Sequence, residues 1–360
     1  MKQICIFFFI LFEINFLNAQ TNVLKMSATK STDFGVTYFL PKTVLAVHVN
    51  YGKTTQKAGP YAQYAEKYLG IKNQSLVPED RVYYTLNSIR VENKGVVDKD
   101  ASYLVEFKSK TTSPFVYLTE DGLICTINAD YTPESDKPGK TATVAPASEL
   151  STTPSHSVFT EEYLQAGSIA KMAEVAAKQI FKLRDSRTNL LTGDVENAPR
   201  DGEGMKIVLS NLEAQEKALV ELFTGTTSVE SFDSDFEVEP HGDIDKNVVF
   251  RFSKYLGIVD KDDLSGSPVY INVKRLEVPE LEEITDPKRK AKEPQSIVYN
   301  IPGKATVEVL FGVNSMYKNT LSIVQFGTKQ ILAPSLFDDK KAPVKIYFYP
   351  ETGAIKQIIQ

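Results

Sequence analysis

The pentapeptide Lys67-Tyr68-Leu69-Gly70-Ile71 recurs unchanged as Lys254-Tyr255-Leu256-Gly257-Ile258, at an offset of 187 residues (254 − 67). The dipeptide Val82-Tyr83 recurs at the same offset as Val269-Tyr270, and the apolar positions that follow it also match. An unchanged spacing with matching periodicity indicates an internal duplication. In each copy the glycine permits a turn and the flanking apolar residues become buried, so we interpret the pentapeptide as a structural motif. A paired ligand site that uses Lys67 and Tyr68 with Lys254 and Tyr255 is the alternative.

Strand-like alternation surrounds both copies and predicts two related β-rich units, residues 34–130 and 225–360. In the first unit a short helix at 61–69 is expected to stop at Gly70. The strands expected in the first unit are 36–49, with a break at Pro41, and 81–92, 102–108, 115–119 and 123–128. Those expected in the second unit are 226–239, 248–252, 269–278, 305–311, 321–326 and a closing hairpin of 344–349 and 354–359.

The residues between the two units have other patterns. Residues 131–159 are rich in Pro, Ser and Thr, which predicts a flexible linker. Residues 160–224 contain two apolar runs at helical spacing and predict an αα-hairpin. Residues 280–296 are first acidic and then basic, so we expect a solvated loop, with a polyanion-binding finger as the alternative. The predicted fold class is α+β, mainly β, with the linker and the helical hairpin between two related β-rich units.

Composition disfavours several function classes. The 360 residues include 41 Lys and Arg against 46 Asp and Glu, a net charge of −5, which disfavours extensive contact with nucleic-acid phosphates. Two cysteines and three histidines are too few for a disulfide framework or a His/Cys-rich metal cluster. We therefore expect no nucleic-acid partner, no cofactor and no metal.

Residues 1–19 have the features of a secretory signal peptide. Lys2 provides the positive start, residues 4–17 are mostly apolar, and Ala19 provides a small residue at the cleavage site. The apolar run is too short for a membrane anchor, and no other stretch is apolar enough to span a bilayer. The sequence thus predicts export to the periplasm, or association with the outer membrane or cell surface. The mature chain keeps only Cys125, which we expect to be a buried, inert thiol rather than a reactive one.

Familiar catalytic motifs are incomplete in this sequence. Ser168-Ile169-Ala170-Lys171 matches the Ser-x-x-Lys of penicillin-binding enzymes, but the partner signatures are missing, so we expect Ser168 to cap a helix. Gly139-Lys140-Thr141 matches only the end of a phosphate-binding loop. The aspartates around Asp243 and Asp260 do not complete a calcium-binding loop. The histidines are far apart in the sequence: His48, His156 and His241.

One acidic array is regular. Asp233, Asp235, Glu237 and Glu239 alternate with other residues, so their carboxylates should project from one face of a strand. We expect a solvated face whose acids pair with lysines of the next strand. The alternatives are a weak calcium or cationic-ligand surface, or part of a hydrolase site that includes Asp233 and Asp235.

Several motifs resemble the family known as domain of unknown function 4831. They are Tyr38-Phe39-Leu40-Pro41-Lys42-Thr43, Ala58-Gly59-Pro60-Tyr61-Ala62-Gln63-Tyr64-Ala65, Asn189-Leu190-Leu191-Thr192-Gly193-Asp194 and Asp263-Leu264-Ser265-Gly266. The resemblance implies a secreted protein of Gram-negative bacteria and supplies no catalytic residues.

These patterns favour a non-enzymatic cell-envelope binding or assembly module. Its expected partner is another envelope protein or a glycan. The alternative is an extracytoplasmic hydrolase that acts on glycan or peptide through carboxylates.

Overall fold

The computed structural model describes residues 22–25, 35–72, 76–106, 116–131, 160–195, 199, 201–276, 296–332, 336 and 344–359. The expected signal peptide at 1–19 lies outside the described residues. So do the expected linker, apart from Tyr131, and the expected charged loop, apart from Ser296.

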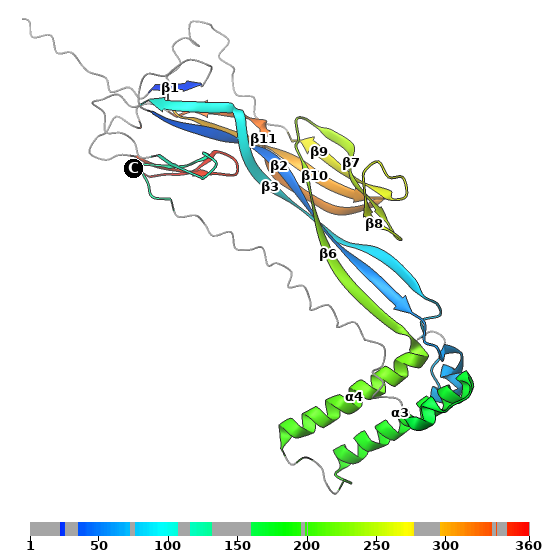
Figure 1. The fold of residues 1–360 in the computed structure, drawn as a ribbon. Helices are drawn as coiled ribbons and strands as arrows, with labels where there is room; N and C mark the ends of the chain where they lie inside the picture. The colour runs from blue at the N-terminus through cyan, green and yellow to red at the C-terminus, as the bar shows by residue number, and fades with distance from the viewer. Residues whose placement is uncertain are drawn as a thin grey trace, which may run out of the picture.

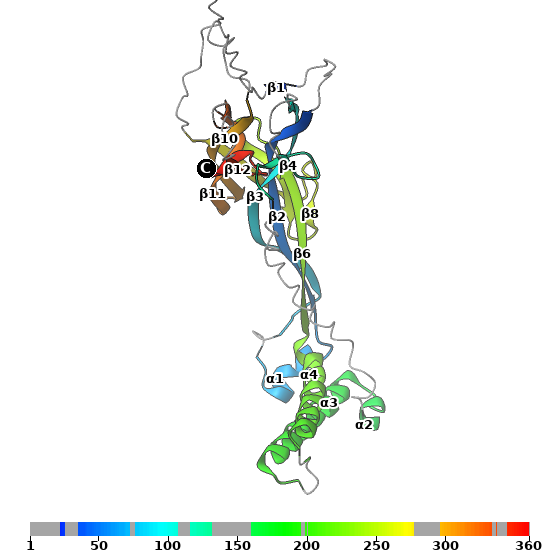
Figure 2. The same cartoon turned by 90° about the vertical axis from the view of Figure 1, so that its left-hand side faces the viewer.

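The fold is α+β and mainly β, with three antiparallel sheets and a group of helices (Figures 1 and 2). Sheet A has the order β1-β3-β2-β6, with the bounds Asn22–Lys25, Arg81–Glu106, Gly35–Lys57 and Thr226–Val238. Sheet C has the order β11-β10-β9-β7-β8, with the bounds Asn314–Ile331, Val298–Phe311, Ser267–Arg275, Ile244–Ser253 and Gly257–Val259. Sheet B has the order β13-β12-β5-β4, with the bounds Ala354–Ile359, Lys345–Tyr349, Ile124–Ile127 and Val116–Leu118.

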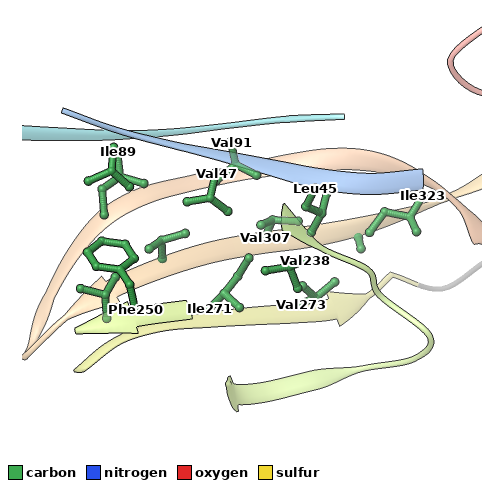
Figure 3. Close-up of a cluster of buried hydrophobic side chains, with 14 of the residues drawn as sticks. Leu45, Val47, Ile89, Val91, Val238, Phe250, Ile271, Val273, Val307 and Ile323 are labelled. Atoms are coloured by element: carbon green, nitrogen blue, oxygen red, sulfur yellow. The ribbon is translucent and has the colours of Figure 1, made fainter. Parts of the chain in front are cut away.

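Sheets A and C pack face to face around the largest apolar core (Figure 3). Leu45 and Val47 of β2 face Ile271 and Val307 of sheet C, and all four are fully buried. The rings of Phe236 and Phe250 stack with centroids 4.7 Å apart across the two sheets. Burial of each large side chain of this kind stabilises the fold by about 1.5–3 kcal/mol, so this core holds the two sheets together.

Sheet B closes a second core against the end of sheet A. Tyr38, Ile127 and Ile346 are fully buried there. The Tyr38 hydroxyl accepts a hydrogen bond from the Val298 amide (2.9 Å) and donates one to the Val298 carbonyl (3.1 Å). Since Tyr38 belongs to β2 and Val298 to β10, this side chain joins two sheets.

Sheet A extends beyond the sandwich as an arm of three strands (Figure 1). β2 has 23 residues, which span about 75 Å at roughly 3.3 Å per residue. It pairs with β3 from Gly35 to Gln56 and with β6 from Leu45 to Lys57. The expected break at Pro41 is wrong, because β2 continues through this residue with only a shift in its pairing with β3.

The helices lie at the far end of the arm (Figures 1 and 2). They are the 3-10 helix η1 (Ala62–Tyr64), α1 (Ala65–Leu69), α2 (Glu161–Leu164), α3 (Ile169–Thr192) and α4 (Gly202–Thr224). α3 and α4 contact one another through a buried cluster that includes Ile180, Leu219 and Phe223. Caps start both long helices: the Ser168 hydroxyl accepts from the Lys171 amide, and the Asp201 carboxylate accepts from the Gly204 amide.

Backbone contacts attach these helices to the arm. The Tyr61 amide donates to the Leu222 carbonyl (2.9 Å), and the Val77 amide donates to the Thr224 carbonyl (2.8 Å). A Cβ at Gly59 would lie 2.5 Å from the Leu222 oxygen, so only glycine permits this approach. The joint is therefore closely packed.

The two copies of the repeated pentapeptide have different local structures. In the first copy Gly70 ends α1 with a φ of 66°, which confirms the expected stop. The second copy forms the turn between β7 and β8, and Gly257 begins β8 with a φ of 77°. Both glycines have a positive φ, but a helix end and a hairpin turn are different backbones. The structure does not confirm the internal duplication.

Strands from the two expected units share sheets. β6 and β12 follow the helices in sequence, yet β6 pairs with β2 and β12 pairs with β5.

In the described part of the chain, no helix combines the length and apolar character needed to cross a membrane.

Candidate functional surface on sheet A

The face of sheet A that is turned away from sheet C carries the acidic array. Along β6, Phe236 and Val238 contact the core, while Asp233, Asp235 and Glu237 alternate with them and are exposed. The side chains of Asp235 and Glu237 are 71% and 57% exposed. The predicted alternation is therefore confirmed, and these carboxylates project from one face of the strand.

Two of the acids pair with lysines, although only Lys42 belongs to the strand next to β6, as expected. Glu237 Oε1 lies 2.6 Å from Lys94 Nζ, and Glu239 Oε1 lies 2.7 Å from Lys42 Nζ. The hydrogen bond to each glutamate raises the pKa of its lysine. Lys42 belongs to β2 and Lys94 to β3. Glu237 of β6 therefore reaches across β2 to β3, and Glu239, which follows β6, contacts β2. Exposed pairs of this kind contribute little stability.

His48 lies between two carboxylates on neighbouring strands. Its Nδ1 is 2.6 Å from Asp235 Oδ1, and its Nε2 is 3.9 Å from Glu92 Oε2. Arg90 contacts Glu92 in turn, with 2.9 Å between Nε and Oε1. These four side chains come from β2, β3 and β6 and lie on the same face of sheet A.

Asp233 differs from the other acids because its hydrogen-bond partner Asn50 is neutral. Its Oδ1 accepts a hydrogen bond from the Asn50 amide (2.8 Å), which also donates to Ser231 (3.0 Å). An amide donor satisfies the oxygen but does not balance the charge. Asp233 thus remains a net negative charge on this face.

The hydrolase alternative requires two carboxylates that act on opposite sides of a bound substrate. Asp233 and Asp235 instead lie on one strand, on one face, about 7 Å apart along the chain. Asp235 contacts His48, and Asp233 contacts Asn50. This arrangement favours an ordered polar surface over a catalytic carboxylate pair.

The other candidates from the sequence lie elsewhere. Ser168 acts as a helix cap, and the Lys171 ammonium contacts Glu174. Cys125 is fully buried, and burial raises the pKa of its thiol to about 11. Gly139-Lys140-Thr141 and His156 lie outside the described residues.

The remaining acids and histidines do not converge. His241 is exposed and lies 3.8 Å from Glu239. Asp243 accepts from the Arg275 amide, and Asp260 accepts from the Asp262 amide of its own loop. Among the described residues, no group of three or more His, Cys, Asp or Glu side chains could hold a metal ion.

The paired ligand site suggested by the repeat would use Lys67 and Tyr68 in one copy and Lys254 and Tyr255 in the other. The structure gives these two pairs different surroundings. Lys67 Nζ lies 5.2 Å from the centroid of the Tyr68 ring, and Tyr68 packs in the helical cluster. Lys254 Nζ lies 5.8 Å from the Tyr83 ring, while Tyr255 is 73% exposed. The two tyrosines therefore have different surroundings.

No pattern in the sequence indicates the neighbours of the acidic strand. β6 pairs with β2, and the strand order places it at the edge of sheet A. Its position directly after α4 was visible in the sequence, but the partner strand lies about 170 residues earlier, with Lys57 opposite Thr226. No local pattern specifies such a pairing.

The fold and this surface define a mainly β, α+β protein with an elongated sheet whose open face is polar. The family model Domain of unknown function (DUF4831) matches residues 34–356, and the chain belongs to this family. No curated protein and no solved structure matches the chain.

Proposed function

We propose that the protein is a non-enzymatic binding or assembly module of the bacterial cell envelope. The observation that carries the proposal is the arm of sheet A, which holds the helices away from the sandwich (Figure 1). Strand β2 spans about 75 Å, so it separates the exposed side chains of the helices from those of the sandwich. Such a shape suits contact with partners at separate places along the molecule.

Exposed apolar side chains occur at two separate places, on the helices and on loops of sheet C. Leu191 at the end of α3 is 68% exposed. Leu264 and Val313 lie in loops at the end of sheet C from which the arm extends, and they are 81% and 97% exposed. Burial of such side chains against a partner is favourable because it removes apolar surface from water.

The envelope location rests on residues 1–19, whose charge and apolar run are typical of a signal peptide. The partner that we propose is another envelope protein or a glycan, in the periplasm or at the cell surface. The polar face of sheet A and the exposed apolar side chains supply contacts of both kinds.

Site-specific photo-crosslinking in intact cells tests the proposal. A photoreactive residue is placed at Leu191, Val313 or Asp235, and adducts are identified by mass spectrometry after cell fractionation. We expect the chain in the envelope fraction and a discrete adduct with one envelope component from at least one position. Retention in the cytoplasm would overturn the proposal. So would hydrolysis of peptidoglycan or peptides by the purified chain that is lost in Asp233→Asn and Asp235→Asn.

A further inference from the structure

The two outer edges of sheet A differ in how far they are covered. Along β3, the Tyr84 amide donates to the Lys254 carbonyl (2.7 Å), and the Val91 carbonyl accepts from the Tyr317 hydroxyl (3.0 Å). β1 pairs with the last residues of β3, Tyr103 to Glu106. Neighbouring elements therefore cover much of this edge.

The β6 edge is open by comparison. All 13 residues of β6 pair with β2 on one side. In the part of the chain that the structure describes, no other strand pairs with β6. An open edge presents unpaired amide and carbonyl groups, and it can accept a further strand from a binding partner.

The charges beside this edge restrict the chemistry of the added strand. β6 contains Glu230, Asp233, Asp235 and Glu237, and it contains no Lys, Arg or His. A second copy of β6 would bring more carboxylates and no cation in any register. Like charges on neighbouring strands are destabilising, so self-pairing is disfavoured. Opposite charges on the added strand are favoured for the same reason.

Val229 adds an apolar position to the pattern. It is 58% exposed, and it lies on the same face of β6 as Asp233 and Asp235 because the three positions differ by even numbers. An antiparallel strand would meet Asp235, Asp233, Ser231 and Val229 at every second residue. The matching partner sequence has a basic residue at its first and third positions and an apolar residue at its seventh.

We propose that the β6 edge binds, by antiparallel strand addition, an extended segment of a partner protein with Lys or Arg at alternate positions and an apolar residue four positions after the second one. Backbone hydrogen bonds to β6 supply the general affinity, and the side-chain pattern supplies the selectivity. This inference rests on the proposed function and names the chemistry of one partner.

A labelled peptide tests the inference directly. The probe is a peptide of about nine residues, with Lys at its first and third positions, Val at its seventh and Thr elsewhere. Its binding to the full chain is measured by fluorescence anisotropy at low salt. A second peptide carries Glu in place of both lysines. We expect the lysine peptide to bind, and the glutamate peptide to bind at least about tenfold more weakly.

Protein variants separate the edge from the overall charge. We expect the double variant Asp233→Lys, Asp235→Lys to bind the lysine peptide at least about tenfold more weakly. The double variant Asp233→Asn, Asp235→Asn removes the charges without changing the size of the side chains, and it should also bind the peptide more weakly. The matched control is Asp130→Lys with Asp262→Lys, which makes the same charge change at exposed residues elsewhere. Hydrogen exchange should show increased protection of amides in residues 226–238 when the peptide is bound.

The inference is wrong if the lysine peptide does not bind, if the control variant loses as much binding, or if binding adds no protection in β6. It is also wrong if the unaltered chain binds no peptide while the double variant Asp233→Ser, Asp235→Ser self-associates. The last result would mean that the acids only prevent aggregation. If the peptide fails while crosslinks from Leu191 or Val313 to an envelope component persist, the inference fails and the proposed function stands.

Discussion

Gly257 lies against the ring of Tyr84, so that a Cβ on this glycine would be 3.0 Å from the ring carbon Cδ1. The Tyr84 amide also donates to the carbonyl of Lys254, three residues before the glycine. The turn between β7 and β8 is thus fitted onto β3 at the point where the arm leaves the sandwich. A glycine is required there both for its positive φ and for this close contact.

Alanine substitution at the two repeated glycines should separate these effects. Gly70 and Gly257 both have a positive φ, but a Cβ at Gly70 meets nothing within 4 Å. We expect Gly70→Ala to cost about 1–2 kcal/mol of folding free energy for the left-handed backbone alone. Gly257→Ala should cost about 1–3 kcal/mol more, because Tyr84 must move. Urea unfolding of both variants measures the difference, and equal losses would contradict the contact with Tyr84.

The Tyr38 hydroxyl should be important for stability. Tyr38→Phe leaves both the amide and the carbonyl of Val298 without this partner in a buried place. We expect a loss of about 1–3 kcal/mol in the free energy of unfolding. Tyr299→Phe is the matched control, because the Tyr299 hydroxyl donates to the side chain of Gln330 at a partly exposed site that water can reach. If both variants lose the same stability, Tyr38 does not join the sheets as described.

The joint between the arm and the helices should be sensitive at Gly59. Gly59→Ala places a methyl group 2.5 Å from the Leu222 oxygen, so the helices must shift. We expect a loss of about 1–3 kcal/mol and faster hydrogen exchange at the Tyr61 amide, which bonds to Leu222. Gly167→Ala is the control, since its Cβ would meet nothing within 4 Å. Unchanged exchange at Tyr61 in Gly59→Ala would show that the joint is not tightly packed.

Local patterns in the sequence predicted local structure well. Gly122 and Gly353 lie between the strands expected at 115–119 and 123–128 and between those of the closing hairpin, and both have the positive φ of a turn. The alternation over β6 correctly places its carboxylates on the surface, and the first apolar run of 160–224 places Ala173 and Ile180 in the core, although Ile169 at its start is exposed. These features depend on residues close in sequence, whose periodicity fixes which side of a strand or helix is apolar.

Long-range pairing could not be predicted in this way. The sequence indicated separate strands at 81–92 and 102–108, but β3 continues from Arg81 to Glu106. β2 pairs with it from Asn93 to Val97 and again from Ser102, with an irregularity between. The pairing of β6 with β2, and therefore the open edge of the candidate surface, depends on the whole fold. The alternation could identify the acidic face but not its neighbours.

The buried thiol of Cys125 predicts a pH dependence of stability. Burial raises its pKa from the ordinary value of 9.0 to about 11, so the folded chain keeps the proton in a range where the unfolded chain loses it. The neutral thiol therefore contributes its full stability below pH 9.0, and this contribution is lost as the pH rises from 9.0 towards about 11. Cys125→Ala should lack this part of the decline, which urea unfolding at several pH values measures as the difference between the two proteins. At pH 7.5 the thiol should react with a maleimide far more slowly in the native chain than in urea, as followed by mass spectrometry of the peptide that contains Cys125. Equal labelling rates in the two conditions would mean that the thiol is accessible and that this pH dependence does not arise from its burial.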